Sequence, residues 1–164
     1  MAGRRAVVVV ASNRASAGIY EDTTGPLIVE ALTTWGFDVG DPVVVGDGSP
    51  VGEAIGAAVA EGVAVVLSTG GTGINPTDRT PEVTAPLLDR ELPGVAEALR
   101  AYGVAKGVPT AMLSRGLAGV SGSTIVINLP GSRGGVKDGL AVLADVIPHA
   151  VDQLAGGDHP GSAS

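Results

Sequence analysis

Four runs of almost unbroken apolar residues constrain the fold of this chain more than any other feature. They cover residues 5–11, 43–45, 63–67 and 123–129, and valine and isoleucine predominate in them. Runs of this length and β-branched content are typical of strands that are buried on both faces. Such strands belong to parallel sheets whose two faces are covered by helices. The pattern therefore predicts an α/β fold, with three α/β/α layers around a mostly parallel central sheet.

The composition fits one domain of this kind. The chain has 164 residues, which is enough for one domain with a hydrophobic core and too few for two ordinary ones. Because 45% of the residues are hydrophobic but only 2% are aromatic, the core has to be built from aliphatic side chains. We expect residues 1–155 to form a single domain and residues 156–164 to be a disordered tail.

A glycine-rich loop, residues 68–73 with the sequence S-T-G-G-T-G, follows the apolar run 63–67. Glycines let the backbone approach a ligand closely, and the hydroxyl groups of serine and threonine donate to phosphate oxygens. Asp78 comes next, and Thr80 opens a Thr-Pro-Glu triplet that predicts a helix with Thr80 as N-cap, reaching about Arg90. The segment is typical of an anion-binding loop beside an acidic residue, although such a loop can also serve only to turn the chain.

Four polar or glycine-rich loops are predicted to lie at one edge of the sheet. They are residues 12–18, 46–49, 68–78 and 130–135, and each follows an apolar run. In open α/β sheets ligands bind beyond the carboxyl ends of the strands, which is where these loops belong. A helix is expected after each loop, and the last one is expected to be long and kinked at Pro148.

The residue types at this edge limit the available chemistry. The chain contains no cysteine, which excludes disulfides, thiolate nucleophiles and cysteine-metal sites. His149 and His159 lie in the predicted last helix and the tail, so neither a Ser-His-Asp triad nor a zinc site is expected. Asp47 and Asp78 offer the hard oxygen ligands that suit Mg²⁺ beside a phosphate substrate. They favour phosphoryl or nucleotidyl transfer, although Asp47 alone also fits an ordinary turn or N-cap.

Charge and hydropathy restrict the partners. The net charge is −7 and the pI is near 4.6, without a basic stripe, so nucleic acids and anionic membranes are not expected partners. Half of the ten Lys and Arg residues lie in or beside glycine-containing loops, which indicates either a local anion site or ordinary surface exposure. They are Arg14, Arg79, Arg115, Arg133 and Lys137. No run has the length of a membrane span and no signal-peptide core is seen, so we expect a cytoplasmic protein.

Three stretches of the chain resemble a known family. Residues 12–26 contain S-N-R-A-S-A-G and D-T-T-G-P, and residues 69–82 read T-G-G-T-G-I-N-P-T-D-R-T-P-E. Residues 112–132 read M-L-S-R-G-L-A-G-V-S-G-S-T-I-V-I-N-L-P-G-S. Together they resemble the molybdenum-cofactor biosynthesis fold family, which includes the Mog-type molybdopterin adenylyltransferases, the MoaB-type proteins and the gephyrin G domain. The resemblance implies a three-layer α/β/α domain that assembles as a homotrimer.

The resemblance also implies an activity and the residues that perform it. Mog-type members use Mg²⁺ and ATP to adenylylate molybdopterin, and they release pyrophosphate. By this resemblance Asp47 and Asp78 are catalytic and hold Mg²⁺. The residues implied to bind phosphate, pterin or nucleotide are Ser12, Gly70, Gly71, Thr72, Gly73, Ser114, Arg115, Pro130, Gly131 and Ser132. Gly48 and Arg133 depart from the family pattern, in which an acidic residue and a proline are frequent at these positions.

Two other functions stay open within this family. MoaB-type proteins carry the same motifs, and a non-catalytic molybdopterin-binding protein of the same pathway is the main alternative. A scaffold in the manner of the gephyrin G domain is the other. The pair of aspartates favours the enzyme, because a carrier has no need for two metal-binding carboxylates. The implied macromolecular partners are further copies of the chain and a molybdate-inserting enzyme that acts downstream.

Overall fold

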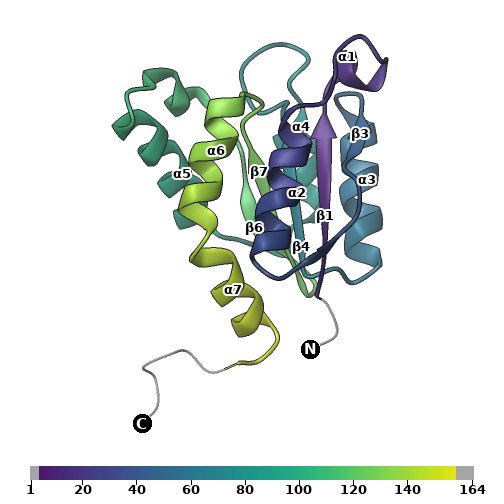
Figure 1. Cartoon of the computed structure of the whole chain (residues 1–164), viewed down its shortest axis with the longest axis vertical. Coiled ribbons are helices and arrows are strands. Elements are labelled where there is room, and N and C mark those ends of the chain that lie inside the picture. Colours follow the sequence, from purple (N-terminus) through teal and green to yellow (C-terminus); the bar gives the residue numbers. More distant parts are fainter. Residues whose placement is uncertain (1–3, 158–164) are drawn as a thin grey trace.

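The computed structural model describes residues 4–157, and its central feature is a seven-stranded sheet flanked by helices (Figure 1). The strands are β1 (Arg5–Ala11), β2 (Asp38–Val39), β3 (Val43–Val45), β4 (Val65–Thr69), β5 (Arg90–Glu91), β6 (Ala118–Ser121) and β7 (Thr124–Leu129). The helices are α1 (Asn13–Ser16), α2 (Thr24–Thr34), α3 (Ser49–Ala60), α4 (Thr80–Thr84), α5 (Pro93–Ala105), α6 (Arg133–Leu143) and α7 (Val146–Leu154). Two 3₁₀ helices complete the set, η1 (Ala85–Leu87) and η2 (Pro109–Leu113).

The sheet is parallel at its centre and antiparallel at one edge. Its strand order is β2-β1-β4-β7-β6-β5, and β3 also pairs with β1. All pairs among β1, β2, β3, β4 and β7 are parallel, whereas β6 runs antiparallel to both β5 and β7. The predicted mostly parallel sheet is thus confirmed. Residues 108–122 contain η2 and the antiparallel strand β6.

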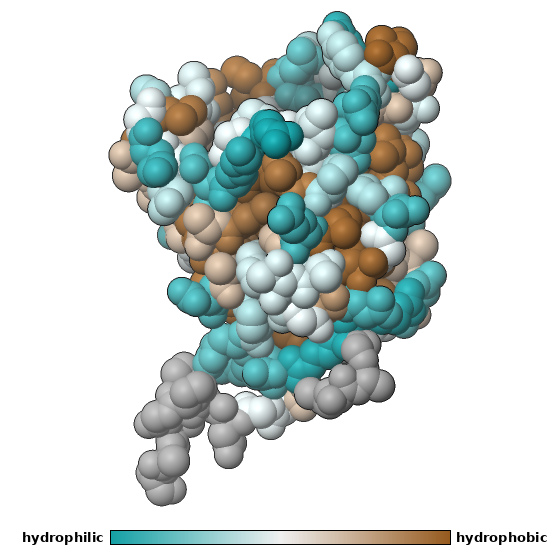
Figure 2. Space-filling view, viewed as in Figure 1, coloured by the Kyte–Doolittle hydropathy of each residue, from teal (hydrophilic) through white to brown (hydrophobic). Residues whose placement is uncertain are grey.

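Two hydrophobic cores, one on each face of the sheet, make the fold three layers thick. Val8 and Val10 of β1 pack into the larger core and Val9 packs into the smaller one, as the two-residue period of a strand requires. Buried residues of α2, α6 and α7 close the larger core, and those of α3 close the smaller one. On the face seen in Figure 2, hydrophilic and hydrophobic residues are interspersed, as on most folded proteins.

The helix after the glycine loop is shorter than the sequence pattern predicts. α4 has five residues, and after η1 the chain enters β5 instead of continuing as a helix to Arg90. Pro86 explains the early end, because proline has no N–H to donate to the preceding turn and its ring crowds that turn. The predicted N-cap is also wrong. Arg79 holds that position, and Thr80 Oγ1 instead donates to the carbonyl oxygen of Gly70 at 2.9 Å.

The predicted long C-terminal helix is divided into α6 and α7, with the break at residues 144–145. Pro148 accounts for the break, because it cannot donate a hydrogen bond to the carbonyl group of Ala144. Most of the predicted tail, residues 158–164, lies outside the described residues, as do residues 1–3. Within residues 4–157, none of the helices combines the length and the apolarity needed to cross a membrane.

Candidate active site

The loops that follow β1, β3, β4 and β7 meet at the carboxyl edge of the sheet. Val10 lies opposite Thr69 across β1 and β4, and Thr69 lies opposite Leu129 across β4 and β7, so these three strands end at the same level. The N–H of Ser12 donates to the carbonyl oxygen of Val45 at 2.9 Å, which joins the end of β3 to the same edge. The four loops that the sequence places at a ligand-binding edge are therefore neighbours in space.

The start of the glycine loop can be formed only by glycine. Gly70 and Gly71 have φ angles of 92° and 68°, in the left-handed region that other residues avoid. A Cβ atom on Gly70 would overlap the carbonyl oxygen of Ala11, and one on Gly71 would overlap Thr80 Oγ1. The loop thus passes against β1 on one side and α4 on the other, with no room for a side chain.

Hydrogen bonds fix the loop and leave three of its amide groups unused. The N–H of Gly70 donates to the carbonyl oxygen of Leu129 at 3.2 Å. The N–H of Thr80 donates to the carbonyl oxygen of Gly71 at 3.0 Å, and the Thr80 hydroxyl donates to that of Gly70 at 2.9 Å. Within residues 4–157, no hydrogen bond uses the N–H groups of residues 71–73. Consecutive free amides in a glycine-rich turn form a site for an anion such as a phosphate.

The two predicted catalytic carboxylates flank this loop. Asp47 Oδ1 lies 3.2 Å from the position that a Cβ atom on Gly71 would take, and Asp78 Oδ2 lies 2.9 Å from the corresponding position on Gly73. Burial raises the pKa of Asp47, and the negative charge of Asp78 raises it further. The structure therefore brings Asp47 and Asp78 close enough to interact, on either side of the three free amides.

This pair of carboxylates fits a hard divalent cation. Burial is the larger cause of the raised pKa of Asp47, and the like charge of Asp78 adds to it, so a cation between the two carboxylates would reduce their repulsion. Mg²⁺ commonly takes one or two carboxylates and completes its shell with water and substrate phosphates. Among the described residues no cluster of three or more His, Cys, Asp or Glu forms a metal site. A cation held here would complete its ligand shell with water and substrate phosphates.

Each aspartate is held by a different support. The backbone N–H of Asp47 donates to Asn13 Oδ1 of α1 at 2.9 Å. The Asp78 carboxylate accepts a hydrogen bond from the N–H of Asn75 at 3.0 Å, and the Asp78 N–H donates to the Asn75 carbonyl at 2.8 Å. Sequence reasoning missed Asn13 as a support, because nothing in its local pattern indicates a contact with a loop 34 positions away.

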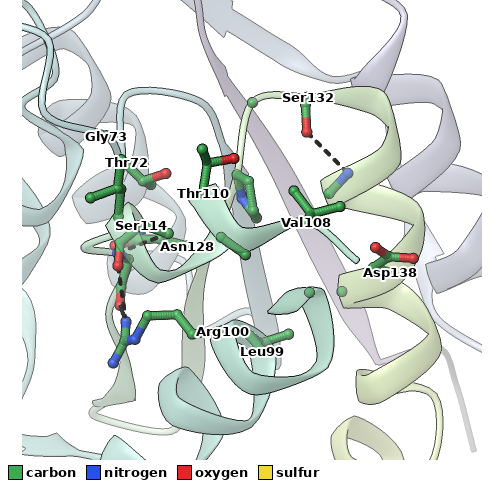
Figure 3. Close-up of a pocket in the computed structure, with 18 of the residues that line it drawn as sticks. Thr72, Gly73, Leu99, Arg100, Val108, Thr110, Ser114, Asn128, Ser132 and Asp138 are labelled. Carbon is green, nitrogen blue, oxygen red and sulfur yellow. Dashed lines mark hydrogen bonds between the residues drawn. The ribbon is translucent and has the colours of Figure 1, made fainter. Parts of the chain in front are cut away.

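A cavity of about 620 Å³ opens beside the loop. The predicted residues that line it are Gly71, Thr72, Gly73, Asp78, Ser114, Pro130, Gly131 and Ser132. Figure 3 shows Thr72, Gly73 and Ser114 on one side of the cavity and Asp138 of α6 on the other. The remaining walls come from α5, η2 and α6, and they are largely apolar or formed by small residues.

Sequence reasoning missed the lining residues Arg100, Thr110 and Asp138. None of the five cations that it singles out in loops lines this cavity, and the cation that does is Arg100, whose Nη1 donates to the carbonyl groups of Ser114 and Gly116 at 3.3 Å. One feature of the sequence could have indicated this wall of the cavity. The small residues Ala96 and Gly103 lie before and after Arg100 on the same helix, and all three line the cavity.

Four predicted site residues do not line this cavity, namely Ser12, Asp47, Gly70 and Arg115. Ser12 lines a second cavity of about 420 Å³, and its hydroxyl group caps α1 by accepting from the N–H of Ala15 at 3.1 Å. Gly70 and Gly131 lie between the two cavities, with the Cα of Gly70 only 3.2 Å from where a Cβ on Gly131 would be. The guanidinium group of Arg115 donates to the carbonyl oxygen of Gly73 and pairs with the carboxylate of Glu82.

Comparisons with known proteins identify the family of the chain. The profile of the family described as "Probable molybdopterin binding domain" matches residues 7–149. The chain belongs to this molybdenum cofactor biosynthesis family. The match covers every strand from β1 to β7 except the first two residues of β1, and it includes all the loops of the candidate site.

Two groups of named relatives match most of this chain. A "Molybdenum cofactor biosynthesis bifunctional protein" of Synechococcus elongatus is 42% identical over 160 residues, which is 97% of this chain and 50% of that protein. The chain thus spans about half the length of the bifunctional relatives that it matches. A "Molybdopterin adenylyltransferase" of Helicobacter pylori is 35% identical over 153 residues, which is 91% of this chain and 86% of that protein.

The fold matches solved structures of the same family. A structure of MogA superposes with a TM-score of 0.90 at 56% sequence identity, over 92% of this chain and 99% of the other. This match confirms the α/β architecture expected from the apolar runs.

Proposed function

We propose that this protein is a molybdopterin adenylyltransferase that uses Mg²⁺ and ATP. In this reaction the terminal phosphate of molybdopterin attacks the α-phosphorus of ATP, and adenylylated molybdopterin and pyrophosphate are the products. One observation carries the proposal. Residues 71–73, whose N–H groups make no hydrogen bond within residues 4–157, line a cavity of about 620 Å³ and lie near the carboxylates of both Asp47 and Asp78. Relatives named molybdopterin adenylyltransferase support the same activity.

The transfer needs positioning and charge neutralisation more than covalent help from the protein. An oxygen of the pterin phosphate forms a bond to the α-phosphorus, while the bond from that phosphorus to the bridging oxygen of the β-phosphate breaks. The electron pair of that bond leaves with pyrophosphate. Because a phosphate monoester is already ionised near neutral pH, the nucleophile needs no general base. This agrees with a site in which no histidine lines the cavity within the described residues.

Residues of the chain have separate tasks in this proposal. The N–H groups of residues 71–73 bind the phosphate oxygens on which negative charge accumulates, as oxyanion-type donors do. Asp47 and Asp78 would hold Mg²⁺, which when bound neutralises polyphosphate charge and favours departure of pyrophosphate. The apolar walls of the cavity, from α5, η2 and α6, exclude water and give a heterocyclic ring a surface to pack on.

We also propose an oligomeric state, a location and a downstream partner. By its family likeness the chain forms a homotrimer in the cytoplasm and delivers its product to a molybdate-inserting enzyme. Support for assembly comes from large apolar side chains that are exposed on the single chain, among them Ile19, Ile74 and Met112 at 62–70% exposure. Light scattering of the purified protein measures the assembly. A mass near three chains is expected, and a monomer at micromolar concentration would contradict it.

Pyrophosphate release from ATP, measured with and without molybdopterin, tests the proposed reaction. We expect release only when ATP, Mg²⁺ and molybdopterin are all present, together with one adenylylated pterin for each pyrophosphate. A non-catalytic binding protein gives a different result, in which molybdopterin binds but no pyrophosphate appears. That result would reject the transferase and leave the carrier as the function.

A further inference from the structure

Arg115 makes hydrogen bonds to the loop that carries Asp78 and to Glu82 of α4. Its Nε donates to the carbonyl oxygen of Gly73 at 2.8 Å, and its Nη2 donates to the carbonyl oxygen of Asp78 at 3.1 Å. Its two terminal nitrogens pair with the carboxylate of Glu82 at 2.6 and 3.2 Å. Its own backbone N–H donates to the carbonyl of Thr72 at 2.7 Å. One residue therefore holds both ends of the segment from Gly73 to Asp78.

We propose that Arg115 is a positioning residue that, paired with Glu82, fixes segment 73–78 and thereby the direction of the Asp78 carboxylate. We call this arrangement the arginine clamp, defined as Arg115, Glu82 and the carbonyl groups of Gly73 and Asp78. The inference rests on the proposed function, because it gives Arg115 a task in the same site. It differs from a phosphate-binding role, since the cavity beside the free amides is not lined by Arg115.

The geometry explains why the clamp acts on Asp78 in particular. Residues 74–77 are exposed, so packing does little to hold this part of the loop. Within it, Asp78 Oδ2 accepts from the N–H of Asn75 at 3.0 Å, which sets the plane of the carboxylate relative to the turn. If the ends of the segment moved apart, that bond would break and the carboxylate would no longer be directed toward Gly73.

Only arginine has the donors that this arrangement uses. A guanidinium group is planar and presents five N–H groups in a fixed fork, so it can pair with a carboxylate by two bonds and still reach two carbonyl groups. A lysine ammonium has three donors at one point and cannot span acceptors on three sides. The hydrogen bond from Arg115 also lowers the pKa of Glu82, so the pair stays ionised through the neutral range.

The clamp is expected to affect activity more than stability. The side chains of Arg115 and Glu82 are 37% and 41% exposed, and ion pairs this exposed contribute little to the free energy of unfolding. A second exposed pair, Arg5 Nη2 with Glu61 Oε2 at 2.8 Å, joins β1 to the end of α3 away from the loop. It provides a matched control, because its loss changes a similar contact without touching the site.

The first test uses hydrogen exchange on the protein without ligands. In Arg115→Gln and Glu82→Gln we expect the amides of Asn75 and Asp78 to exchange about tenfold or more faster than in the wild type. The Arg5→Gln variant is expected to leave both rates unchanged, and all three variants should keep the wild-type melting temperature within a few degrees. Unchanged exchange at Asn75 and Asp78 in Arg115→Gln would overturn the proposal.

The second test uses turnover. In Arg115→Lys and Arg115→Gln we expect kcat to fall about 10- to 100-fold and the Mg²⁺ concentration for half-maximal rate to rise, with KM for molybdopterin nearly unchanged. Guanidinium ion added to Arg115→Ala should restore part of the rate, and Arg5→Gln should behave as wild type. A higher KM for molybdopterin with unchanged kcat would show that Arg115 binds substrate directly, which contradicts a positioning role.

The two tests separate failure of the clamp from failure of the proposed function. If the wild type releases no pyrophosphate, the transferase proposal fails, while faster exchange in Arg115→Gln still supports the clamp. If the wild type is active and Arg115→Gln keeps both its exchange rates and its Mg²⁺ dependence, the clamp fails and the transferase stands.

Discussion

Asp47 and Asp78 reach the same glycine loop, but the fold places them by different means. Asp47 follows β3 directly and precedes α3, so the position of its backbone is set by the sheet and by one bond to Asn13. Asp78 lies nine residues beyond the end of β4, in an exposed turn that depends on the arginine clamp and on Asn75. The backbone of Asp47 is therefore held close to the edge of the sheet, whereas Asp78 is held by hydrogen bonds from Arg115 and Asn75.

In the proposed metal site, Asp47 would be a fixed ligand and Asp78 an adjustable one. A cation site with one rigid and one adjustable carboxylate can bind a metal-polyphosphate complex and still change its geometry as pyrophosphate departs. The adjustable side faces the cavity, since Asp78 lines it and Asp47 does not. Substitutions of the two aspartates and of the residues around them test whether the two carboxylates are equally necessary.

Removing either charge is expected to have the largest effect. Asp78→Asn and Asp47→Asn should each lower the rate of pyrophosphate release about 10³-fold, because a metal-bound carboxylate stabilises the transition state by several kcal/mol. Binding of molybdopterin, followed by its fluorescence, should persist in Asp78→Asn. Asp41→Asn, at an exposed position away from the loop, serves as the control. Wild-type turnover in either site variant would show that the paired-carboxylate assignment is wrong.

A substitution between the two aspartates should come next. Gly71→Ala places a Cβ atom against Thr80 Oγ1 and 3.2 Å from Asp47 Oδ1, at a φ angle of 68°. We expect a rate loss of about 100-fold and a loss of about 1–3 kcal/mol in the free energy of unfolding, from backbone strain and the contact together.

Gly107→Ala separates these two causes, because Gly107 has a φ angle of 94° and nothing within 4 Å of its Cβ position. It should lose about 1 kcal/mol of stability from strain alone and retain full activity. Equal activity in Gly71→Ala and Gly107→Ala would mean that close packing at the loop does not matter for the reaction.

Much of this site follows from the sequence, and the predictions that were wrong or missing have physical causes. The apolar runs predict the parallel strands. The topology of parallel strands then places the loops at Asp47 and Asp78 at one edge of the sheet, independently of side-chain contacts. The short α4 was predictable too, since Pro86 is visible in the sequence and forbids the longer helix. The direction of the Arg115 side chain was not, because its partners lie 33 to 42 positions earlier and no local pattern records such contacts.

Two asparagine variants change the surroundings of the two aspartates to different extents. Asn13→Ala removes the oxygen that accepts from the Asp47 N–H, and we expect about a tenfold loss of rate. Asn75→Ala removes only the side-chain oxygen that accepts from Thr77 and leaves the backbone N–H that donates to Asp78, so a smaller loss is expected. Steady-state kinetics with Mg²⁺ titration measures both. A larger loss of rate in Asn75→Ala than in Asn13→Ala would contradict this expectation.

The smallest expected effect concerns stability and its dependence on pH. Burial, and then the charge of Asp78, raise the pKa of Asp47 above its ordinary value of 3.8. The folded protein therefore keeps this proton to a higher pH than the unfolded chain does. Ionisation of Asp47 lowers the free energy of unfolding as the pH rises from 3.8 through the raised folded value.

Asp47→Asn removes that penalty, so the variant should be more stable than the wild type at neutral pH, by about 0.5 kcal/mol after solvent screening of a half-exposed group. The gain should be absent near the pKa of the unfolded chain, grow as the pH rises and then become constant. Urea unfolding between pH 4 and 8 measures it. A gain independent of pH would assign the effect to packing instead of charge. A pH-dependent gain in a variant that has lost turnover would show that the carboxylate is kept for chemistry at the expense of stability.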